Sequence, residues 1–220
     1  VFARAGLDDI LIAYPLWIDD SAVARLRVLA ETVRLSIGCD SLESVRALPV
    51  GLAALLVEVD CGHHRSGVAA CDAGQLAARL VAAGHVVRGA LTFPGHSYAP
   101  GVASAVAAEE AQALVEAGEA MAAAGVAATE LGGGSPPSRA FADSRLTEYR
   151  PGVYVFNDAQ QWELGVCMPD QVALTCHARV VSRRADRVVL DSGSKVLGAD
   201  RAPYASGGGR LLDDPEARIT

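Results

Sequence analysis

Short apolar runs alternate with amphipathic stretches along the first two thirds of the chain. The apolar runs are continuous and rich in valine, isoleucine and leucine, which is typical of parallel strands buried on both faces. We therefore expect six strands, at Asp9–Tyr14, Arg34–Gly38, Ala54–Val59, Val86–Leu91, Ala127–Leu131 and Gly152–Phe156.

The amphipathic stretches between these runs predict helices. Asp19–Val33 begins with aspartate and serine, which suit an N-cap. Asp72–Ala83 and the alanine- and glutamate-rich Ala103–Ala124 are followed by Gly84 and Gly125, and glycine is a common residue after a helix. The alternation of strand and helix indicates an α/β protein with a parallel sheet and right-handed crossovers.

The number of strands favours an incomplete barrel. No Gly-x-Gly-x-x-Gly motif follows the first strand, which disfavours a dinucleotide-binding Rossmann fold. A (β/α)8 barrel of the TIM type fits better, but six predicted strands are fewer than the eight of a closed barrel. We therefore expect the chain to be an internal fragment that begins inside such a barrel.

The pattern changes after about Leu164. Val172–Ser182 and Arg187–Leu190 alternate or are β-branched, and Arg183–Asp186 between them has the character of a turn, so we expect an antiparallel hairpin. The sequence thus predicts two domains: a partial (β/α) barrel over residues 1–164 and part of a C-terminal β-domain over residues 165–220.

Composition excludes some classes of protein. Apolar residues make up 51% of the chain and charged residues 20%, as in ordinary globular proteins, and the net charge of -7 argues against a nucleic-acid partner. The longest apolar runs, such as Gly51–Val59, are too short to span a bilayer, and Val1–Arg4 does not begin like a signal peptide. Five cysteines without a Cys-x-x-Cys pair favour free thiols in the cytoplasm.

Polar residues follow several predicted strands, at the ends where barrel enzymes hold their reactive groups. Asp60–Gly67, Phe93–Tyr98 and Gly132–Ser135 follow the third, fourth and fifth strands. In Gly132–Ser135 the missing Cβ atoms let backbone N–H groups approach an anion, and Ser135 adds a hydroxyl donor. A plain flexible loop is an equal alternative from the local residues, but the place after a strand favours phosphate binding.

The arginine and histidines at these ends each have two interpretations. Arg65 could contact an anionic or aromatic cofactor group or be a solvated surface arginine, and its place between glycines favours the cofactor. His96 could stack on a flat ring or relay a proton, or be a hydrogen-bonded loop histidine. His63 and His64 beside Cys61 suggest a metal, but neighbours on an extended segment point to opposite sides. We therefore expect no metal site in this chain.

Lys195 is the only lysine in the chain. It is therefore the only candidate here for an amine nucleophile that forms a Schiff base. It lies beyond the predicted barrel, and the local residues alone leave its role open.

Together these segments resemble the D-threonine aldolase and D-serine dehydratase family, metal-activated relatives of alanine racemase with the type III fold of pyridoxal enzymes. The ordered set covers nearly the whole chain, and Phe93–Tyr98 is more similar to the D-serine deaminase branch. The matching segments are Asp9–Pro15, Glu58–Asp60, Gly62, Arg65–Val68, Phe93–Tyr98, Gly132–Ser135, Arg150–Asp158 and Asp191–Lys195.

The resemblance implies a (β/α)8 barrel followed by a β-domain, with pyridoxal 5'-phosphate at the mouth of the barrel. It implies that Arg65 lies at the cofactor ring and His96 against its face. Arg150 matches an arginine that faces the pyridine nitrogen in alanine racemases, a position where threonine aldolases often differ. The residues implied to hold the phosphate or lie near it are Gly133, Gly134, Ser135, Gly152 and Tyr154.

Two family elements have no counterpart in the chain. The family's Schiff-base lysine lies on the first barrel strand, upstream of anything that matches Val1, and Lys195 matches a different family lysine. The family's metal site, a histidine with a cysteine or aspartate two residues later, has no match before Thr220. We expect the catalytic lysine and a zinc or manganese ion in the full-length enzyme, and no catalysis by this fragment alone.

The function implied by the resemblance is a lyase that acts on D-amino acids, with D-serine converted to pyruvate and ammonia. Cleavage of D-threonine to glycine and acetaldehyde is the alternative, because the barrel motifs serve both reactions. Two further alternatives are a non-catalytic pyridoxal-phosphate-binding protein and a metal hydrolase that uses His63, His64 and His96. We expect a cytoplasmic homodimer whose partner is a small D-amino acid, without nucleic acid or membrane.

Overall fold

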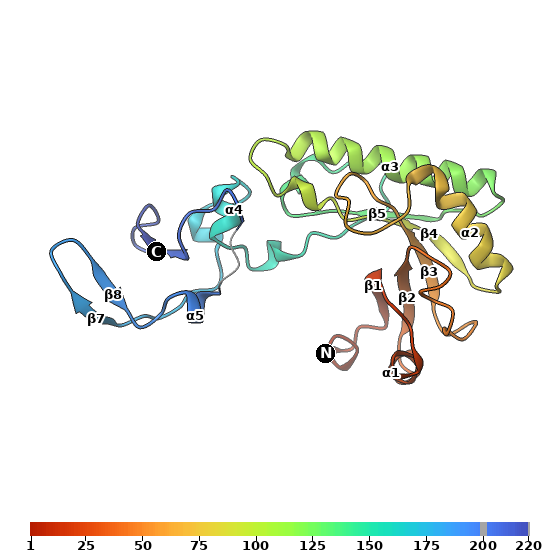
Figure 1. The fold of residues 1–220 in the computed structure, drawn as a ribbon, viewed down its shortest axis with the longest axis horizontal. Coiled ribbons are helices and arrows are strands. Elements are labelled where there is room, and N and C mark those ends of the chain that lie inside the picture. Colours follow the sequence, from red (N-terminus) through yellow and green to blue (C-terminus); the bar gives the residue numbers. More distant parts are fainter. Residues whose placement is uncertain (199–201, 220) are drawn as a thin grey trace. The chain divides into compact units, whose positions relative to one another are not determined.

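The chain folds into two compact units in the computed structural model, which describes residues 1–198 and 202–219 except for the side chains of Ser194 and Lys195. The first unit comprises Val1–Ser97 and Ala103–Arg150, and the second comprises the rest (Figure 1). The domain boundary expected near Leu164 stays a prediction.

The first unit contains a parallel sheet of six strands in the order β1-β2-β3-β4-β5-β6, curled into a half-barrel (Figure 1). Five of the predicted strands are confirmed to within three residues, because continuous apolar runs locate buried parallel strands well. The α/β class and the incomplete barrel are confirmed as well. The strands are β1 (Asp9–Pro15), β2 (Arg34–Cys39), β3 (Ala54–Glu58), β4 (Val87–Leu91), β5 (Glu130–Gly133) and β6 (Glu148–Tyr149).

The sixth strand is not where the sequence pattern indicated. Gly152–Phe156 was expected to be a strand, but Val153–Val155 is a turn of 3-10 helix. The last ladder hydrogen bond runs from Arg150 N–H to the carbonyl of Gly133, at 2.6 Å. Pro151 follows directly, and because proline has no N–H and a fixed φ it ends the pairing there.

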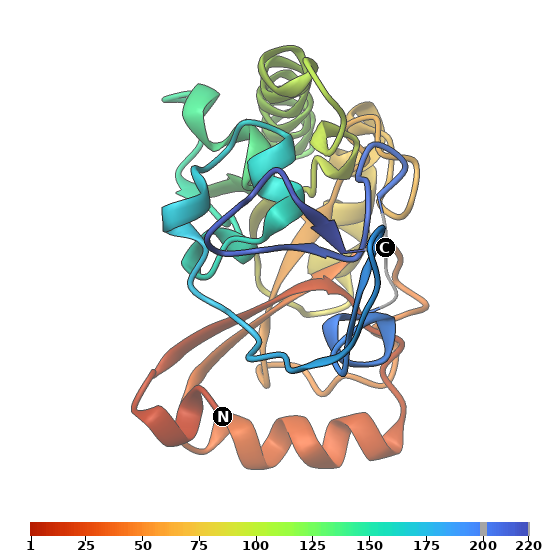
Figure 2. The same ribbon diagram turned by 90° about the vertical axis from the view of Figure 1, so that its left-hand side faces the viewer.

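Three helices cover the half-barrel, and all three were expected from the sequence. The Asp19 side chain caps the first by accepting the N–H of Ala22 at 2.8 Å. This helix packs against β2 (Figure 2), while the other two pack against each other and against β3, β4 and β5. The helices are α1 (Asp20–Ala30), α2 (Ala73–Ala82) and α3 (Ala103–Ala123).

The core of the first unit lies between the sheet and these helices. Leu55 and Val57 of β3 are fully buried, as are Leu80 of α2 and Leu114 of α3. Burial on the helix side of the sheet holds the strand ends in fixed relative positions, which is what a site built from several strand ends requires.

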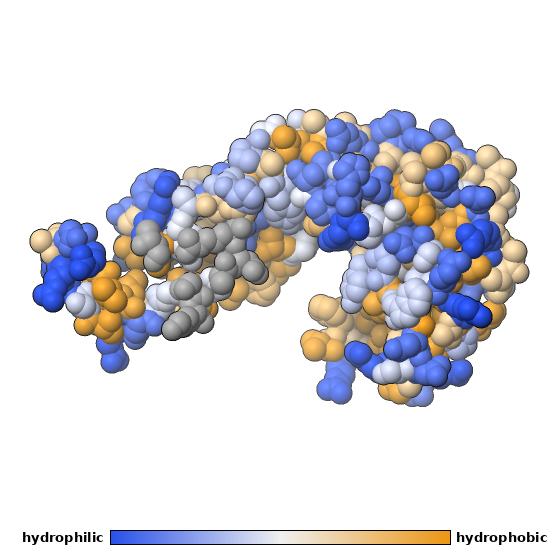
Figure 3. Space-filling view, in the orientation of Figure 1, coloured by the Kyte–Doolittle hydropathy of each residue, from blue (hydrophilic) through white to orange (hydrophobic). Residues whose placement is uncertain are grey.

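Apolar side chains reach the surface beside β1, which is one edge of the sheet. Phe2 is 66% exposed and Leu7 is 53% exposed, and Figure 3 shows hydrophobic residues near the N-terminal end of the chain. In this sheet β1 therefore leaves one strand edge unpaired, beside exposed apolar side chains.

The second unit contains short elements. The expected hairpin is present, but its first strand begins at Val180 instead of Val172. Its partner β8 is only three residues long, so there is no strand for the residues before Val180 to pair with. No helix in the described part of the chain is long and apolar enough to cross a membrane. The elements are α4 (Ala159–Glu163), β7 (Val180–Arg183), β8 (Val188–Leu190), α5 (Ser194–Leu197), β9 (Gly209–Arg210) and β10 (Arg218–Ile219).

Candidate functional site

A cavity of about 520 Å³ opens in the first unit at the carboxyl ends of all six strands. Three residues predicted to bind a cofactor, Arg65, Gly134 and Arg150, line it together. They come from segments far apart in the sequence, and the parallel strands bring them to one edge of the sheet. The complete lining is Ala13, Tyr14, Pro15, Asp40, Arg65, Ser66, Thr92, Phe93, Gly134 and Arg150.

Arg150 is a largely buried cation with unused hydrogen-bond donors. Its side chain is 19% exposed, and its Nη1 lies 3.1 Å from an oxygen of Glu148. That contact lacks hydrogen-bond geometry, so neither Nη1 nor Nη2 has a hydrogen-bond partner. The guanidinium lies where a Cβ at Gly132 would be, so the glycine leaves it the space for this position. Buried donors without partners are costly, and an anionic ligand in the cavity would satisfy them.

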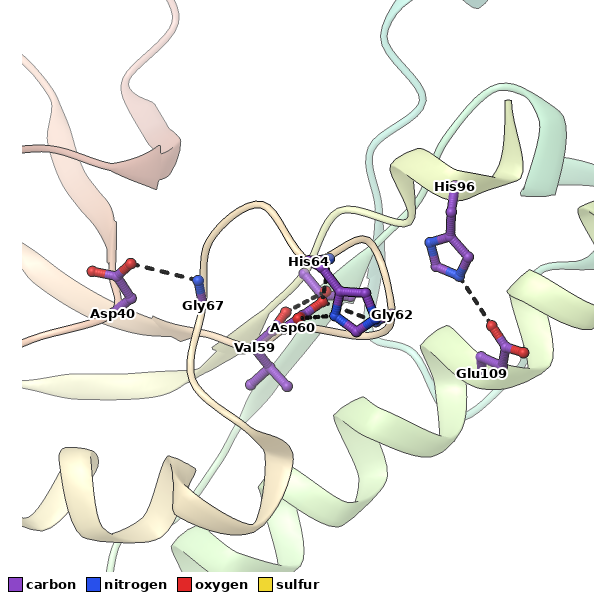
Figure 4. Close-up of polar contacts among 9 residues, drawn as sticks. Asp40, Val59, Asp60, Gly62, His64, Gly67, His96 and Glu109 are labelled. Carbon is purple, nitrogen blue, oxygen red and sulfur yellow. Dashed lines mark hydrogen bonds and ion pairs between the residues drawn. The ribbon is translucent and has the colours of Figure 1, made fainter. Parts of the chain in front are cut away.

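Arg65 is held at the cavity by the tightly turned loop that follows β3. The Asp60 carboxylate accepts the N–H groups of Gly62 and His64, both at 2.9 Å, and lies 2.7 Å from His64 Nδ1 (Figure 4). Burial acts to raise the pKa of Asp60, but these hydrogen bonds keep that pKa below its usual value. The Arg65 guanidinium lies 4.8 Å from the centroid of the Phe93 ring, a cation–π arrangement.

Gly67 closes the same loop. Its φ is +98°, and a Cβ there would meet the backbone of Val59 and Asp60. The Gly67 N–H also points to Asp40 at 3.5 Å (Figure 4). A glycine is therefore required at this position for the loop to present Arg65 to the cavity.

Glu58 is a buried carboxyl group that the sequence analysis did not select. One of its oxygens accepts the Ser66 hydroxyl at 2.6 Å, and the other is buried without a partner. Burial raises the pKa of Glu58, against the lowering effects of Ser66 and Arg65. The available signal was a carboxylate within the apolar run of β3, because such a group is almost never buried without a reason.

His96 lies in the 3-10 turn Gly95–Ser97 after β4 and is not among the residues that line the cavity. Its Nε2 lies 3.0 Å from Glu109 of α3 (Figure 4), and its Nδ1 is buried without a partner. Its ring stacks on that of His63, with centroids 6.3 Å apart, and a Cβ at Gly95 would overlap His63. The expected contact of His96 with a cofactor face stays a prediction.

Metal binding has no support in the described residues. No group of three or more histidine, cysteine, aspartate or glutamate side chains among them could hold a metal ion. Burial, with Arg65 and His96 nearby, lowers the pKa of His63, and this ring lies edge-on to Phe93 at 5.6 Å. The hydrolase alternative built on His63, His64 and His96 has no support among the described residues and stays a prediction.

The glycine loop after β5 is held from the side of α3. Gly134 has a φ of +117°, and its N–H donates to Glu110. Gly133 leaves the space that Glu110 fills, since a Cβ there would overlap this carboxyl group. Ser135 is completely buried, and of the loop residues only Gly134 lines the cavity. Glu110 is a second buried carboxyl group that the sequence analysis did not select.

Three further residues lie outside the first unit. Gly152 and Tyr154 belong to the second unit, where Tyr154 is 44% exposed, and their roles at a phosphate stay predictions. The side chain of Lys195 lies outside the described residues. A second cavity, of about 400 Å³, lies in this unit around Trp162 and Arg210, and no predicted site residue lines it.

Residues 10–160 match the family model described as alanine racemase, N-terminal domain. An uncharacterized protein of Mycobacterium tuberculosis (strain ATCC 25618 / H37Rv) is 40% identical over 144 residues, 63% of this chain and 84% of that protein. D-threo-3-hydroxyaspartate dehydratase of Delftia sp. (strain HT23) is 39% identical over 156 residues, and D-serine dehydratase of Dictyostelium discoideum is 26% identical over 163 residues. Each of these two alignments covers 66% of this chain but only 41% of the dehydratase.

Solved structures agree with these sequence matches. The D-threo-3-hydroxyaspartate dehydratase from Delftia sp. HT23 has a TM-score of 0.81 at 30% identity, covering 91% of this chain and 57% of that chain. A D-threonine aldolase from Filomicrobium marinum has a TM-score of 0.70 at 26% identity, covering 90% of this chain and 58% of that chain. The resemblance expected from the sequence motifs is confirmed.

Proposed function

The chain belongs to the alanine racemase N-terminal domain family, and on this premise we propose that it is the cofactor-binding part of a lyase that acts on D-amino acids. Proteins of this family are pyridoxal-phosphate enzymes, and the homologues of the chain include D-amino acid dehydratases and an aldolase. The chain spans about half the length of these relatives or less, so the proposal concerns the complete protein.

The residues at the cavity fit pyridoxal phosphate. A volume of about 520 Å³ is within the usual range of small-molecule sites. The buried Nη1 and Nη2 of Arg150 have no hydrogen-bond partner, and this is the observation that carries the proposal. Arg150 and Arg65 would hold the polar atoms of the ring, and the backbone at Gly134 would lie close to the phosphate.

When bound, the cofactor supplies an electron sink for the charge that develops at Cα of the substrate. The chain's own residues bind and orient. Arg65 and Arg150 attract anionic groups into the cavity, and the charge of the largely buried Arg150 acts more strongly there than it would in water. Glu58, through Ser66, holds the loop that carries Arg65. Phe93 supports the Arg65 guanidinium through a cation–π contact.

The substrate we propose is a 3-hydroxy-D-amino acid, with D-serine dehydrated to pyruvate and ammonia. Support comes from the Phe93–Tyr98 run and from two relatives that are named dehydratases, for D-serine and for D-threo-3-hydroxyaspartate. Cleavage of D-threonine is the second candidate, and the structural likeness to a D-threonine aldolase favours it.

A divalent metal ion belongs to the proposal for the complete protein. One solved structure of D-threo-3-hydroxyaspartate dehydratase is of a mutant in the metal-free form, which supports a metal in this group of enzymes. Such an ion would act as a Lewis acid on the departing hydroxyl group. The homodimer and the cytoplasmic location expected from the sequence are likewise proposals.

The test uses the complete protein encoded by the gene, supplied with pyridoxal phosphate and either zinc or manganese. It is assayed with D-serine, D-threonine and D-threo-3-hydroxyaspartate. We expect ammonia with pyruvate from D-serine. Glycine and acetaldehyde from D-threonine, without any 2-oxo acid from the other two, would rule out the dehydratase. A cofactor absorbance band without turnover of any D-amino acid would favour a non-catalytic binding protein.

A further inference from the structure

Four hydroxyl groups form a continuous chain behind the glycine loop of the first unit. Ser97 Oγ lies 2.7 Å from Ser135 Oγ, which lies 2.8 Å from Ser138 Oγ, which lies 2.5 Å from the Tyr149 hydroxyl. The three serines are completely buried. The three serine hydroxyls are therefore shielded from bulk water, and Tyr149 forms the less buried end of the chain.

Glu110 stands at the end of this chain. It lies on α3 and is 1% exposed, and the side chain of Tyr149 interacts with it and acts to lower its pKa. It also accepts the N–H of Gly134, the loop residue that lines the cavity. One carboxyl group is thus connected to the glycine loop twice, through the backbone at Gly134 and through the hydroxyls that lead to Ser135.

The charge of Glu110 determines the direction of the hydrogen bonds, because each hydroxyl has a single proton to donate. When Glu110 is a carboxylate it only accepts, so Tyr149 donates to it, Ser138 donates to Tyr149, and Ser135 donates to Ser138. When Glu110 is a neutral acid it donates to Tyr149, and the chain reverses. Ser135 then accepts from Ser138 and shares its other hydrogen bond with Ser97, so the reversal is completed inside the buried chain.

A phosphate bound against Gly134 would favour the neutral acid. Its charge would lie close to the carboxylate that accepts the Gly134 N–H, and two buried anions so close together raise each other's pKa. The Ser135 hydroxyl is completely buried and does not line the cavity, so it is the backbone at Gly134 that would meet the phosphate.

We propose that Glu110 takes up one proton from solvent when a phosphate group binds against Gly134, and that it is a positioning residue for this loop. The proposal rests on the function proposed above, because it takes the phosphate to be that of the cofactor. Proton balance is simple: one proton leaves the solvent, Glu110 becomes neutral, and no bond of the cofactor changes.

The groups around Glu110 allow this response near neutral pH. Burial is the main influence and raises the pKa of Glu110 to about 7, against the lowering effects of Gly134, Arg150 and Tyr149. The other ionisable groups that face it do not titrate there, because burial raises the pKa of Tyr149 to about 12 and that of Cys61 to about 11. Arginine stays protonated throughout this range.

The experiment compares pyridoxal phosphate with pyridoxal, which lacks the phosphate, as ligands of the complete protein. Dissociation constants are measured from pH 6 to pH 8 for the wild type and for Glu110→Gln. The amide of glutamine accepts from Gly134 and donates to Tyr149, as the neutral acid does. For each protein, the affinity for pyridoxal phosphate is divided by the affinity for pyridoxal. From pH 6 to pH 8 we expect this ratio to fall about tenfold more for the wild type than for Glu110→Gln.

The phosphate of the ligand itself ionises near pH 6, and this affects the pH dependence of binding equally in the wild type and in Glu110→Gln. The difference in pH dependence between the two proteins therefore reports Glu110 alone. Glu116→Gln, an exposed residue on the same helix, is the matched control and should behave as the wild type does. Equal pH dependence in wild type and Glu110→Gln would overturn the proposal. Failure of the wild type to bind either ligand would instead overturn the proposed function.

A second measurement needs no variant. Calorimetry at pH 8 in buffers of different ionisation enthalpy reports the protons taken up on binding. We expect pyridoxal phosphate to take up about one proton more than pyridoxal, because Glu110 is mostly ionised in the free protein at this pH. Equal proton uptake for the two ligands would contradict the proposal.

Discussion

The guanidinium of Arg150 lies against the backbone of Gly132, in the space that a side chain at residue 132 would fill. Gly132 lies in β5, and Arg150 directly follows the neighbouring strand β6. A glycine in β5 thus makes room for the buried cation that faces the cavity.

Gly132→Ala should displace this guanidinium without straining the backbone at residue 132, because the φ of Gly132 is not in the left-handed region. We expect the complete protein to bind pyridoxal phosphate about tenfold more weakly, equivalent to one lost charge-assisted hydrogen bond. A fluorescence titration measures this.

Gly118→Ala on α3 is the matched control, since its Cβ would make only ordinary contacts of 3.5 Å with Leu131. It should keep the affinity and raise the stability by up to about 1 kcal/mol, because alanine favours a helix. Equal affinities of the two variants would show that Arg150 does not depend on Gly132.

Arg150→Met should separate stability from binding. Removing a buried cation whose donors are unsatisfied should leave the free energy of unfolding of the cofactor-free protein unchanged or raise it by about 1 kcal/mol. The same variant should lose affinity for pyridoxal phosphate, about tenfold or more. Denaturant unfolding and cofactor titration check the two parts. A less stable variant with normal cofactor affinity would mean that Arg150 is structural.

Glu110 should make the cofactor-free protein less stable as the pH rises. Burial raises its pKa to about 7 in the folded protein from the 4.5 of a free side chain, so the folded state holds the proton more tightly. The stability from this proton is complete below about pH 4.5 and is lost as the pH rises through about 7. We expect Glu110→Gln to lack this loss, which amounts to at most roughly 3 kcal/mol.

Urea unfolding of wild type and variant between pH 5 and pH 8 measures this difference. Glu116→Gln should keep the wild-type profile, since Glu116 is exposed on the same helix. Parallel profiles for the wild type and Glu110→Gln would mean that the carboxyl group is already ionised in the folded state at pH 5.

Gly67→Ala should damage the loop that carries Arg65. The φ of +98° strains any L side chain, and the new Cβ would also meet the backbone of Val59 and Asp60. Gly51→Ala is a matched control, with a φ of +83° and open space around it, so it adds only the strain of φ, about 1 kcal/mol. We expect Gly67→Ala to cost about 2 kcal/mol more and to weaken cofactor binding. Thermal unfolding of both variants decides this, and equal losses would refute the backbone overlap.

The sequence by itself determined most of the elements of the first unit. Strands β1 to β4 begin within one residue of their expected positions, because apolar runs that are buried on both faces have a strong local signal. Asp19 marked the start of α1 by capping it. Because the ends of these strands could be located, the polar segments after β3, β4 and β5 were identified as well. The motifs in these segments were enough to indicate the family.

Only the tertiary structure decided which of these residues meet. The pattern in Gly152–Phe156 indicated a strand, yet pairing with β5 ends at Arg150 because Pro151 cannot donate to the ladder. Glu110 stands in an alanine- and glutamate-rich helix, and its sequence neighbourhood does not distinguish it from the exposed Glu109 beside it. Its burial depends on the packing of α3 against β5, where Gly133 leaves space for its carboxyl group and the Gly134 N–H donates to it. Burial of a charged group is a property of its surroundings in space, and local sequence carries no record of residues that lie twenty or more positions away.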